Sequence, residues 1–180
     1  ALFVPAWTPA AAATGAAPAQ HLVLSCVPSV SPHVPGAAFV DIDMHGDMSE
    51  RYESAAASLL EAIQALVPQP GRHLVQVVVP QAGEAQLLGG LGGLLRTAQR
   101  ENPRIVGQLI EVEPGQDIAR AIADSRESLA SRIRYVDGVR QEGAWQETAA
   151  PSVARSPWKA GGTYLVTGGA AGALIGLMFV

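Results

Sequence analysis

The sequence predicts an α/β fold in which helices flank a mainly parallel sheet. Two patterns predict this class. Short apolar runs of strand length alternate along the chain with longer stretches whose apolar residues recur at helical spacing. The run 73–79 is also apolar on both faces, as is expected of a parallel strand that helices cover on either side.

The expected strands are short β-favouring runs bounded by proline, glycine or polar residues. They cover residues 2–7, 21–27, 38–43, 73–79, 105–112 and 164–167. The first of them contains Pro5 and is expected at a sheet edge, because proline cannot donate to a neighbouring strand. Asp137 and Gly138 lie between two β-favouring arms in 133–141 and therefore predict a hairpin.

The expected helices lie over residues 52–67, 83–102 and 117–126. Apolar residues of the first helix fall on one side, and Asp47 or Ser49 precedes it as a candidate N-cap. Pro68 and Pro103 follow the first two helices directly, and proline cannot continue a helix.

A stretch rich in proline, serine and alanine divides the sequence near residue 150. It predicts one domain over 1–150, a linker over 151–161, and a strand, turn and helix over 162–180 that begin a second, incomplete domain. The apolar end of the last segment is expected to pack against a partner elsewhere, or to be a cut end.

The composition is that of an ordinary globular protein, with 48% hydrophobic and 16% charged residues. A net charge of −4 argues against a nucleic-acid partner, which requires clustered lysine and arginine. The single cysteine, Cys26, excludes an internal disulfide framework, and a reducing cytoplasm is expected. We expect no signal peptide, and residues 170–180 are too few to span a bilayer, so no membrane partner is expected.

The segment 162–176 is the candidate for cofactor binding. Its strand, glycine turn and helix start have the layout of a dinucleotide-binding unit, in which backbone amides at a helix N-terminus hold a pyrophosphate. The chain stops one helix into that unit. It supplies no second strand, no residue to meet a ribose and no catalytic half, so the cofactor site is begun and not finished.

Two other clusters are weaker candidates. Asp41, Asp43 and His45 alternate and would share one face of a strand, which suits a hard metal ion, but a strand end entering a solvated loop explains them better. The remaining histidines are isolated and are expected at strand edges or on the surface: His21, His33 and His73.

The glycines of 89–93 resemble a phosphate loop only superficially. The Lys-Ser/Thr of a P-loop is missing, and the segment lies among helical residues instead of directly after a strand. Because each glycine costs about 1 kcal/mol relative to alanine in a helix, a packing reason is expected: close approach of this helix to the sheet.

A complete catalytic set is missing from the sequence. A short-chain reductase needs a tyrosine of lowered pKa with a lysine and a serine beside it. None of Tyr52, Tyr135 and Tyr164 has a lysine or asparagine one helical turn later. The sequence also contains no Gly-x-Ser-x-Gly elbow, no His-Glu-x-x-His helix and no thiol–histidine pair.

Several stretches resemble the structural subdomain of modular polyketide synthase ketoreductases, in particular those whose acyltransferase acts in trans. The most specific are Leu-Gly-Gly-Leu-Leu-Arg-Thr-Ala-Gln-Arg-Glu-Asn-Pro at 91–103, continued by 107–112. The hairpin 133–138 with Trp145 is similar to the end of that subdomain, and Pro5-Ala6-Trp7 to its first strand. Residues 162–172 resemble the opening of the catalytic subdomain, so the resemblance covers nearly the whole chain.

The resemblance implies a truncated Rossmann-like half that binds no cofactor. In that family it buttresses a second half, which binds NADPH and reduces the β-keto group of a chain tethered to an acyl carrier protein. Thr167, Gly168, Gly169 and Gly172 match the cofactor loop of that second half. The family pattern Thr-Gly-Gly-x-Gly-Gly-Leu-Gly is not fully kept, since Ala171 carries a side chain where the pyrophosphate needs close backbone approach.

Three hypotheses follow for the function. The favoured one is a scaffold, not catalytic by itself, that supports the catalytic half or neighbouring synthase domains. The alternative is a fragment of an intact NADPH-dependent β-ketoacyl reductase. The third is a free-standing nucleotide-binding module that uses 168–176, which the altered glycines disfavour. Whether the parent is an enzyme stays open at this point.

Overall fold

The computed structural model describes residues 2–12, 15–27, 33–40 and 42–149. The chain divides into two compact units, and the described structure is almost entirely that of one of them, Phe3–Glu147. The linker and the terminal strand, turn and helix expected over 151–180 lie outside the described residues.

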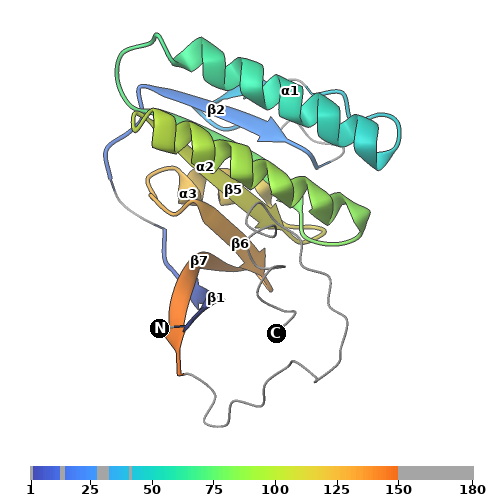
Figure 1. Cartoon of the computed structure of the whole chain (residues 1–180), viewed down its shortest axis with the longest axis vertical. Coiled ribbons are helices and arrows are strands. Elements are labelled where there is room, and N and C mark those ends of the chain that lie inside the picture. The colour runs from blue at the N-terminus through green and yellow to red at the C-terminus, as the bar shows by residue number, and fades with distance from the viewer. Residues whose placement is uncertain (1, 13–14, 28–32, 41, 150–180) are drawn as a thin grey trace, which may run out of the picture. The chain divides into compact units, whose positions relative to one another are not determined.

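One sheet of seven strands, in the order β1-β7-β6-β5-β4-β2-β3, runs through this unit (Figure 1). From β3 to β6 all neighbours are parallel, and β7 pairs antiparallel with β6. The mainly parallel sheet predicted from the sequence is confirmed. The strands are β1 Leu2–Pro9, β2 Gln20–Ser25, β3 Ala38–Val40, β4 His73–Pro80, β5 Ile105–Val112, β6 Arg132–Val136 and β7 Val139–Thr148.

Helices cover the sheet on both faces (Figure 1). On one face α1 (Met48–Leu66), the 3₁₀ helix η1 (Glu84–Gly90) and α2 (Leu91–Glu101) pack on β2, β4 and β5. On the other face α3 (Ile118–Ser125) packs on β4, β5 and β6. Side-chain alternation along the strands separates the two cores, so that Val77 belongs to the first and Val78 to the second.

The start of α1 follows the cap chemistry read from the sequence. Asp47 accepts a hydrogen bond from the N–H of Glu50, and the Glu50 carboxylate accepts one from the N–H of Asp47, which completes a capping box. Asp117 caps α3 in the same way by accepting from Arg120 N–H at 3.0 Å.

Several expected boundaries were wrong: α1 begins at Met48 instead of residue 52, and two further differences change the local structure. The third strand ends at Val40 instead of residue 43, so the polar residues after it no longer alternate on a strand. The single helix expected over 83–102 is a 3₁₀ turn followed by α2. The change falls at Gly90, where an added Cβ would lie 2.8 Å from the Tyr52 hydroxyl. Glycine at this position lets α1 and the helical segment come together and weakens the regular α-helix.

The hairpin is built as predicted. Asp137 and Gly138 both have positive φ, at 50° and 73°, which is the two-residue turn whose twist suits antiparallel strands. The turn joins β6 to β7 with Val136 paired to Val139. The last strand then runs on to Thr148, seven residues past the end of the expected arm, and lies beside β1.

A chain of buried hydrogen bonds crosses the neighbouring strands β2, β4 and β5 beneath α3. His21 contacts Gln76 at 2.6 Å, Gln76 contacts Gln108 at 2.7 Å, and Gln108 donates to the Ser128 carbonyl at 2.6 Å. His21 and both glutamines are no more than 3% exposed. His73 is likewise buried, at 1% exposed, so the prediction that His21 and His73 lie at a strand edge or on the surface was wrong. Of the three isolated histidines, His33 is the exposed one.

The donor and acceptor roles in this series of hydrogen bonds follow from its last bond, at the Ser128 carbonyl. A carbonyl only accepts, so Gln108 turns its amide N–H₂ to Ser128 and its oxygen to Gln76. Gln76 must then turn its oxygen to His21, which leaves the imidazole protonated on Nε2 and its Nδ1 without a partner among the described residues. Burial lowers the pKa of His21, Gln76 raises it by a smaller amount, and the charge of Arg126 lowers it further.

The contact between α2 and β5 predicts opposite effects for two glycines. A Cβ on Gly107 would lie 2.8 Å from the Leu95 Cβ and 3.1 Å from the Leu95 carbonyl oxygen, whereas one on Gly93 would meet nothing within 4 Å. Gly107→Ala is expected to destabilise the chain by about 1–3 kcal/mol through overpacking. Gly93→Ala is expected to stabilise it by up to about 1 kcal/mol. Urea unfolding measures both, and equal effects of the same sign would contradict this close approach.

The neutral His21 predicts a loss of stability in mild acid. Its pKa is lowered in the folded state, so the unfolded chain binds the proton more readily and stability rises with pH. The contribution of neutral His21 to the free energy of unfolding is complete above pH 6.5, the ordinary pKa of histidine, and is lost as the pH falls below it. We expect His21→Gln to reduce this loss in urea titrations on either side of that pH. His33→Gln, at an exposed position, is the control and should keep the wild-type dependence.

Candidate functional site

The first candidate site is the topological switch point of the sheet. From β2 the chain moves outward to β3, and from β4 it moves outward in the opposite direction to β5 and β6. Open α/β sheets bind ligands in the crevice at the carboxyl ends of two such strands. That edge is formed here by the residues that follow Ser25 and Pro80.

The switch point lacks the parts that hold a pyrophosphate. A dinucleotide-binding unit places a glycine turn and a helix directly after this first strand. Here β2 is followed by Cys26-Val27-Pro28, the next glycine is Gly36, and the described part of 26–37 contains no helix. Near the strand ends the side-chain oxygens of Ser25 and Gln81 are buried, neutral and without a partner in the described structure.

The cysteine at this edge is not a nucleophile. Cys26 is 1% exposed and packs in the core under α1. Burial raises the pKa of its thiol to about 12, so it stays protonated at neutral pH.

The glycine segment 89–93 serves packing, as predicted. A Cβ on Gly92 would approach the Leu109 side chain to 3.3 Å, and one on Gly90 would overlap Tyr52. The glycines lower the helix propensity of this segment, and they allow its close contact with β5 and α1. Only Gly93 has no neighbour near its missing Cβ.

The tyrosines within the described residues do not form a reductase site. Tyr135 comes close to a serine, with its hydroxyl 3.5 Å from Ser125 Oγ, and it donates to the Ala121 carbonyl at 3.3 Å. Burial raises its pKa, while the Ser125 hydrogen bond and the charge of Arg140 lower it by less. Catalysis by proton donation near neutral pH needs a shift in the other direction. Tyr52 lies against Gly90, and Tyr164 is outside the described residues.

One of the three candidate metal ligands lies outside the described residues. Asp41 is not described, while Asp43 and His45 are highly exposed and hydrogen-bond each other at 2.8 Å. The backbone N–H of His45, and then its ring, lower the pKa of Asp43. Among the described residues no three histidine, cysteine or acidic side chains converge on one point.

The expected cofactor loop cannot be compared with the structure. Thr167, Gly168, Gly169 and Gly172 all lie outside the described residues, as do the linker and the apolar end.

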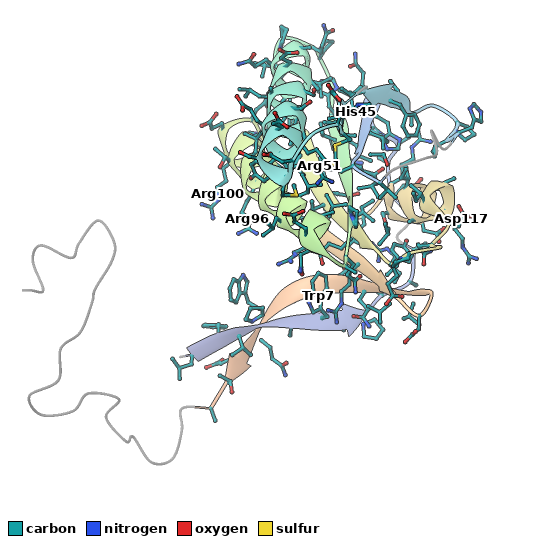
Figure 2. All side chains as sticks on the ribbon, turned by 90° about the vertical axis from the view of Figure 1, so that its right-hand side faces the viewer. Trp7, His45, Arg51, Arg96, Arg100 and Asp117 are labelled. Atoms are coloured by element: carbon teal, nitrogen blue, oxygen red, sulfur yellow. The ribbon has the colours of Figure 1, made fainter. Side chains whose placement is uncertain are left out.

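A feature that the sequence reasoning missed is a face on which arginines and tryptophans gather. Arg96 and Arg100 project from one side of α2, near Trp7 of β1 (Figure 2). The Arg132 and Arg134 guanidinium groups lie over the Trp7 ring, at 5.2 and 4.3 Å from its centroid. The arginine spacing was visible in the sequence, but their gathering depends on β1 lying beside β7, which no local pattern indicates.

Two adjoining cavities follow this face. One, of about 320 Å³, lies between β1, α2, β6 and β7, and the other, of about 170 Å³, lies between the glycine segment and β6. They share Arg96, Ser131 and Arg132. We call the set Trp7, Arg96, Arg100, Arg132 and Trp145 the arginine–tryptophan face.

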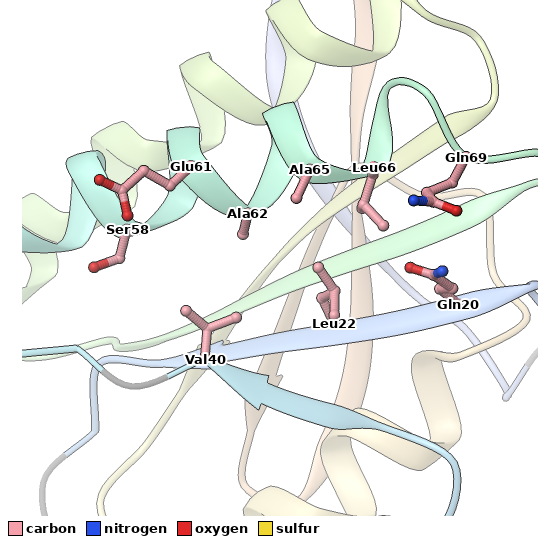
Figure 3. Close-up of a pocket in the computed structure, with 9 residues that line it drawn as sticks. All are labelled: Gln20, Leu22, Val40, Ser58, Glu61, Ala62, Ala65, Leu66 and Gln69. Carbon is pink, nitrogen blue, oxygen red and sulfur yellow. The ribbon is translucent and has the colours of Figure 1, made fainter.

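A further cavity of about 450 Å³ lies at the opposite edge of the sheet, between α1 and the strands β2 and β3 (Figure 3). Leu22 and Val40 form its floor, and small side chains of α1 form its roof. Its one titratable group is Glu61, so the lining offers no pair of groups for acid–base work.

Comparison with known proteins places the chain among polyketide synthases. PksL of Bacillus subtilis (strain 168) is 40% identical over 139 residues, which cover 73% of this chain. PksN of the same organism is 34% identical over 188 residues, which cover 95% of it. Each match spans only 3% of the relative's length. No family model matches the chain.

Solved ketoreductases share the fold. A ketoreductase domain from the bacillaene assembly line superposes with a TM-score of 0.69 at 26% identity, over 83% of this chain and 38% of that one. An A1-type ketoreductase superposes with a TM-score of 0.55 at 17% identity, over 86% and 44%, which supports the fold alone.

By sequence and by fold the chain is a polyketide synthase ketoreductase-like segment. The family resemblance predicted from 91–112 and the hairpin is thereby confirmed, as is the Rossmann-like class. Within the described residues no helix has the length and apolar character that crossing a bilayer requires.

The environment of Tyr135 predicts a late titration. Because burial raises its pKa above the ordinary value of 10.0, its phenol should ionise after an exposed tyrosine as the pH is raised. Tyr135→Phe should remove this late component from an ultraviolet titration, and Tyr52→Phe should leave it in place. A Tyr135 that ionised below 10.0 would contradict the structural role and reopen a catalytic one.

Proposed function

We propose that residues 1–150 are the structural, non-catalytic half of a polyketide synthase ketoreductase, and that their role is to support a catalytic half or neighbouring synthase domains. The observation that carries this proposal is the switch point between β2 and β4. It has neither a glycine turn nor, in the described part of 26–37, the helix that would hold a pyrophosphate. A Rossmann-like sheet without that cradle still packs against its helices, but it has no backbone amides placed to bind a dinucleotide.

We propose further that 151–161 are a linker and 162–180 the first strand and helix of the catalytic half. The match to PksN takes in 95% of the chain and so extends into residues 150–180, which supports placing this segment in the same ketoreductase-like region. Thr167, Gly168, Gly169 and Gly172 would then be cofactor-loop positions and NADPH the cofactor of the completed half. Acyl carrier protein and adjacent synthase domains would be its partners, in the cytoplasm.

The alternative is that this sequence is one part of an intact NADPH-dependent β-ketoacyl reductase acting on carrier-tethered polyketide intermediates. The coverage favours it as a serious second candidate, because the chain spans 38% of the bacillaene ketoreductase and 3% of PksL. In that case the scaffold described here belongs to an active enzyme, and the catalytic tyrosine, serine and lysine lie beyond Val180.

Titration with NADPH tests the scaffold proposal. By calorimetry we expect the 180-residue chain to show no binding up to millimolar NADPH, because its own switch point lacks the pyrophosphate cradle and the terminal loop is incomplete. Micromolar binding would overturn the purely structural role. Gly169→Val is the control for that outcome, since it should abolish binding only if the terminal glycine turn is the site.

The same titration on the chain extended by the natural downstream sequence separates the two candidates. Binding and NADPH oxidation with a carrier-tethered β-keto substrate would establish the intact reductase. Absence of both in the extended protein would establish a scaffold that serves no active half.

A further inference from the structure

We propose that the arginine–tryptophan face binds a helical segment of a protein partner that presents carboxylates on one side. The inference goes beyond the proposed scaffold role, because it concerns a surface of the described unit and is independent of any cofactor. The occupant is identified by its chemistry alone.

The face exists because the sheet extends further than the helices that cover it. On the side of α1 and α2, helix α2 packs on β4 and β5, whereas β6, β7 and β1 continue beyond it (Figure 1). Gly143 keeps the floor of the resulting groove low, since a Cβ there would lie 3.3 Å from the Trp7 ring. The groove is thus bounded by α2 on one side and by the β7 strand on the other.

The charge of the groove is one-sided. Arg96 and Arg100 are exposed, and neither forms an ion pair with another described residue. Arg132 pairs with Glu111 at 2.6 Å, but Glu111 does not line either cavity, and neither lining contains an acidic residue. In a chain of net charge −4 this surface therefore stands out as cationic and attracts an anionic partner.

The apolar part of the face distinguishes a protein from a small anion. Trp145 is 67% exposed, and Phe3, which alternation along β1 places on the side of Trp7, is 56% exposed. Phosphate bound by the arginines would leave both rings in water, whereas a partner helix covers them. Tryptophan and arginine are also the residue types that dominate interface hot spots, and lysine is depleted there.

The arginine spacing selects the form of the acidic partner. Arg96 and Arg100 lie four residues apart on α2, so they are neighbours on one side of the helix, about 6 Å apart at their Cβ atoms. Carboxylates one turn apart on a second helix have the same spacing. Such a helix could pair its acidic side with α2 and place its apolar side on Trp145.

Binding of a defined peptide tests the proposal. The probe is a fluorescein-labelled helical peptide of alanine, leucine and glutamate with glutamates one turn apart, and its partner probe has glutamine in their place. Fluorescence anisotropy with the 180-residue chain should show binding of the glutamate peptide, weakened by added salt. Arg96→Gln together with Arg100→Gln should weaken it at least about tenfold, and Trp145→Ala should also weaken it.

Arg120→Gln is the matched control, because Arg120 is an exposed arginine on α3, on the opposite face of the sheet. It should bind the peptide as the wild type does. Equal binding of both peptides, no binding of either, or wild-type affinity in the double arginine variant would overturn the proposal. Displacement of the peptide by inorganic phosphate at comparable concentration would overturn it in favour of a small-anion site.

Discussion

The buried hydrogen-bond chain from His21 to the Ser128 carbonyl is the constraint on which the arrangement of the sheet depends. Gln76 and Gln108 face each other in register on β4 and β5, and a slip of one residue between these strands would turn one amide to the opposite face and leave the other without its partner. An unsatisfied amide in this core costs about 1–3 kcal/mol, so the alternative pairings are penalised as well as the correct one favoured. The same series of hydrogen bonds reaches α3, because Gln76 also donates to the Ile122 carbonyl. This bond fixes the distance between α3 and the sheet.

With the register fixed, the opposite face of the sheet is free to accept α2 at close range. Gly107 on β5 and Gly92 on α2 remove the side chains that would hold the two elements apart. This contact places α2 over β4 and β5, and the sheet continues past it with β6, β7 and β1. The arginines on the outer side of α2 therefore overlook β6, β7 and β1 instead of packing on them. The uncovered face is thus set by the position of α2 over β4 and β5 in a sheet of seven strands.

The sequence predicted the elements whose signals are local. The N-cap at Asp47, one of two candidates, the Asp137–Gly138 turn and the doubly apolar strand β4 each depend on residues within a few positions of one another. It failed where distant residues decide. From the sequence His21 is expected to be solvated, but in the fold it is buried beside Gln76. The helix is expected to continue through Gly90, but there the segment packs against Tyr52. The same limit hid the arginine–tryptophan face, since Trp7 and Arg132 are joined only by the pairing of sheet edges.

The proposals for the switch point and for the arginine–tryptophan face agree with each other. A Rossmann-like sheet offers a ligand crevice at one edge of its strands, and here that edge has buried Cys26 and neutral side chains in place of a phosphate cradle. Two apolar cores hold its helices against the two faces of the sheet, which gives a rigid platform. On a rigid platform, exposed arginines and tryptophans lose little conformational freedom when a partner binds. The protein recognition that we propose for the arginine–tryptophan face lies away from the crevice that the fold would use for a nucleotide.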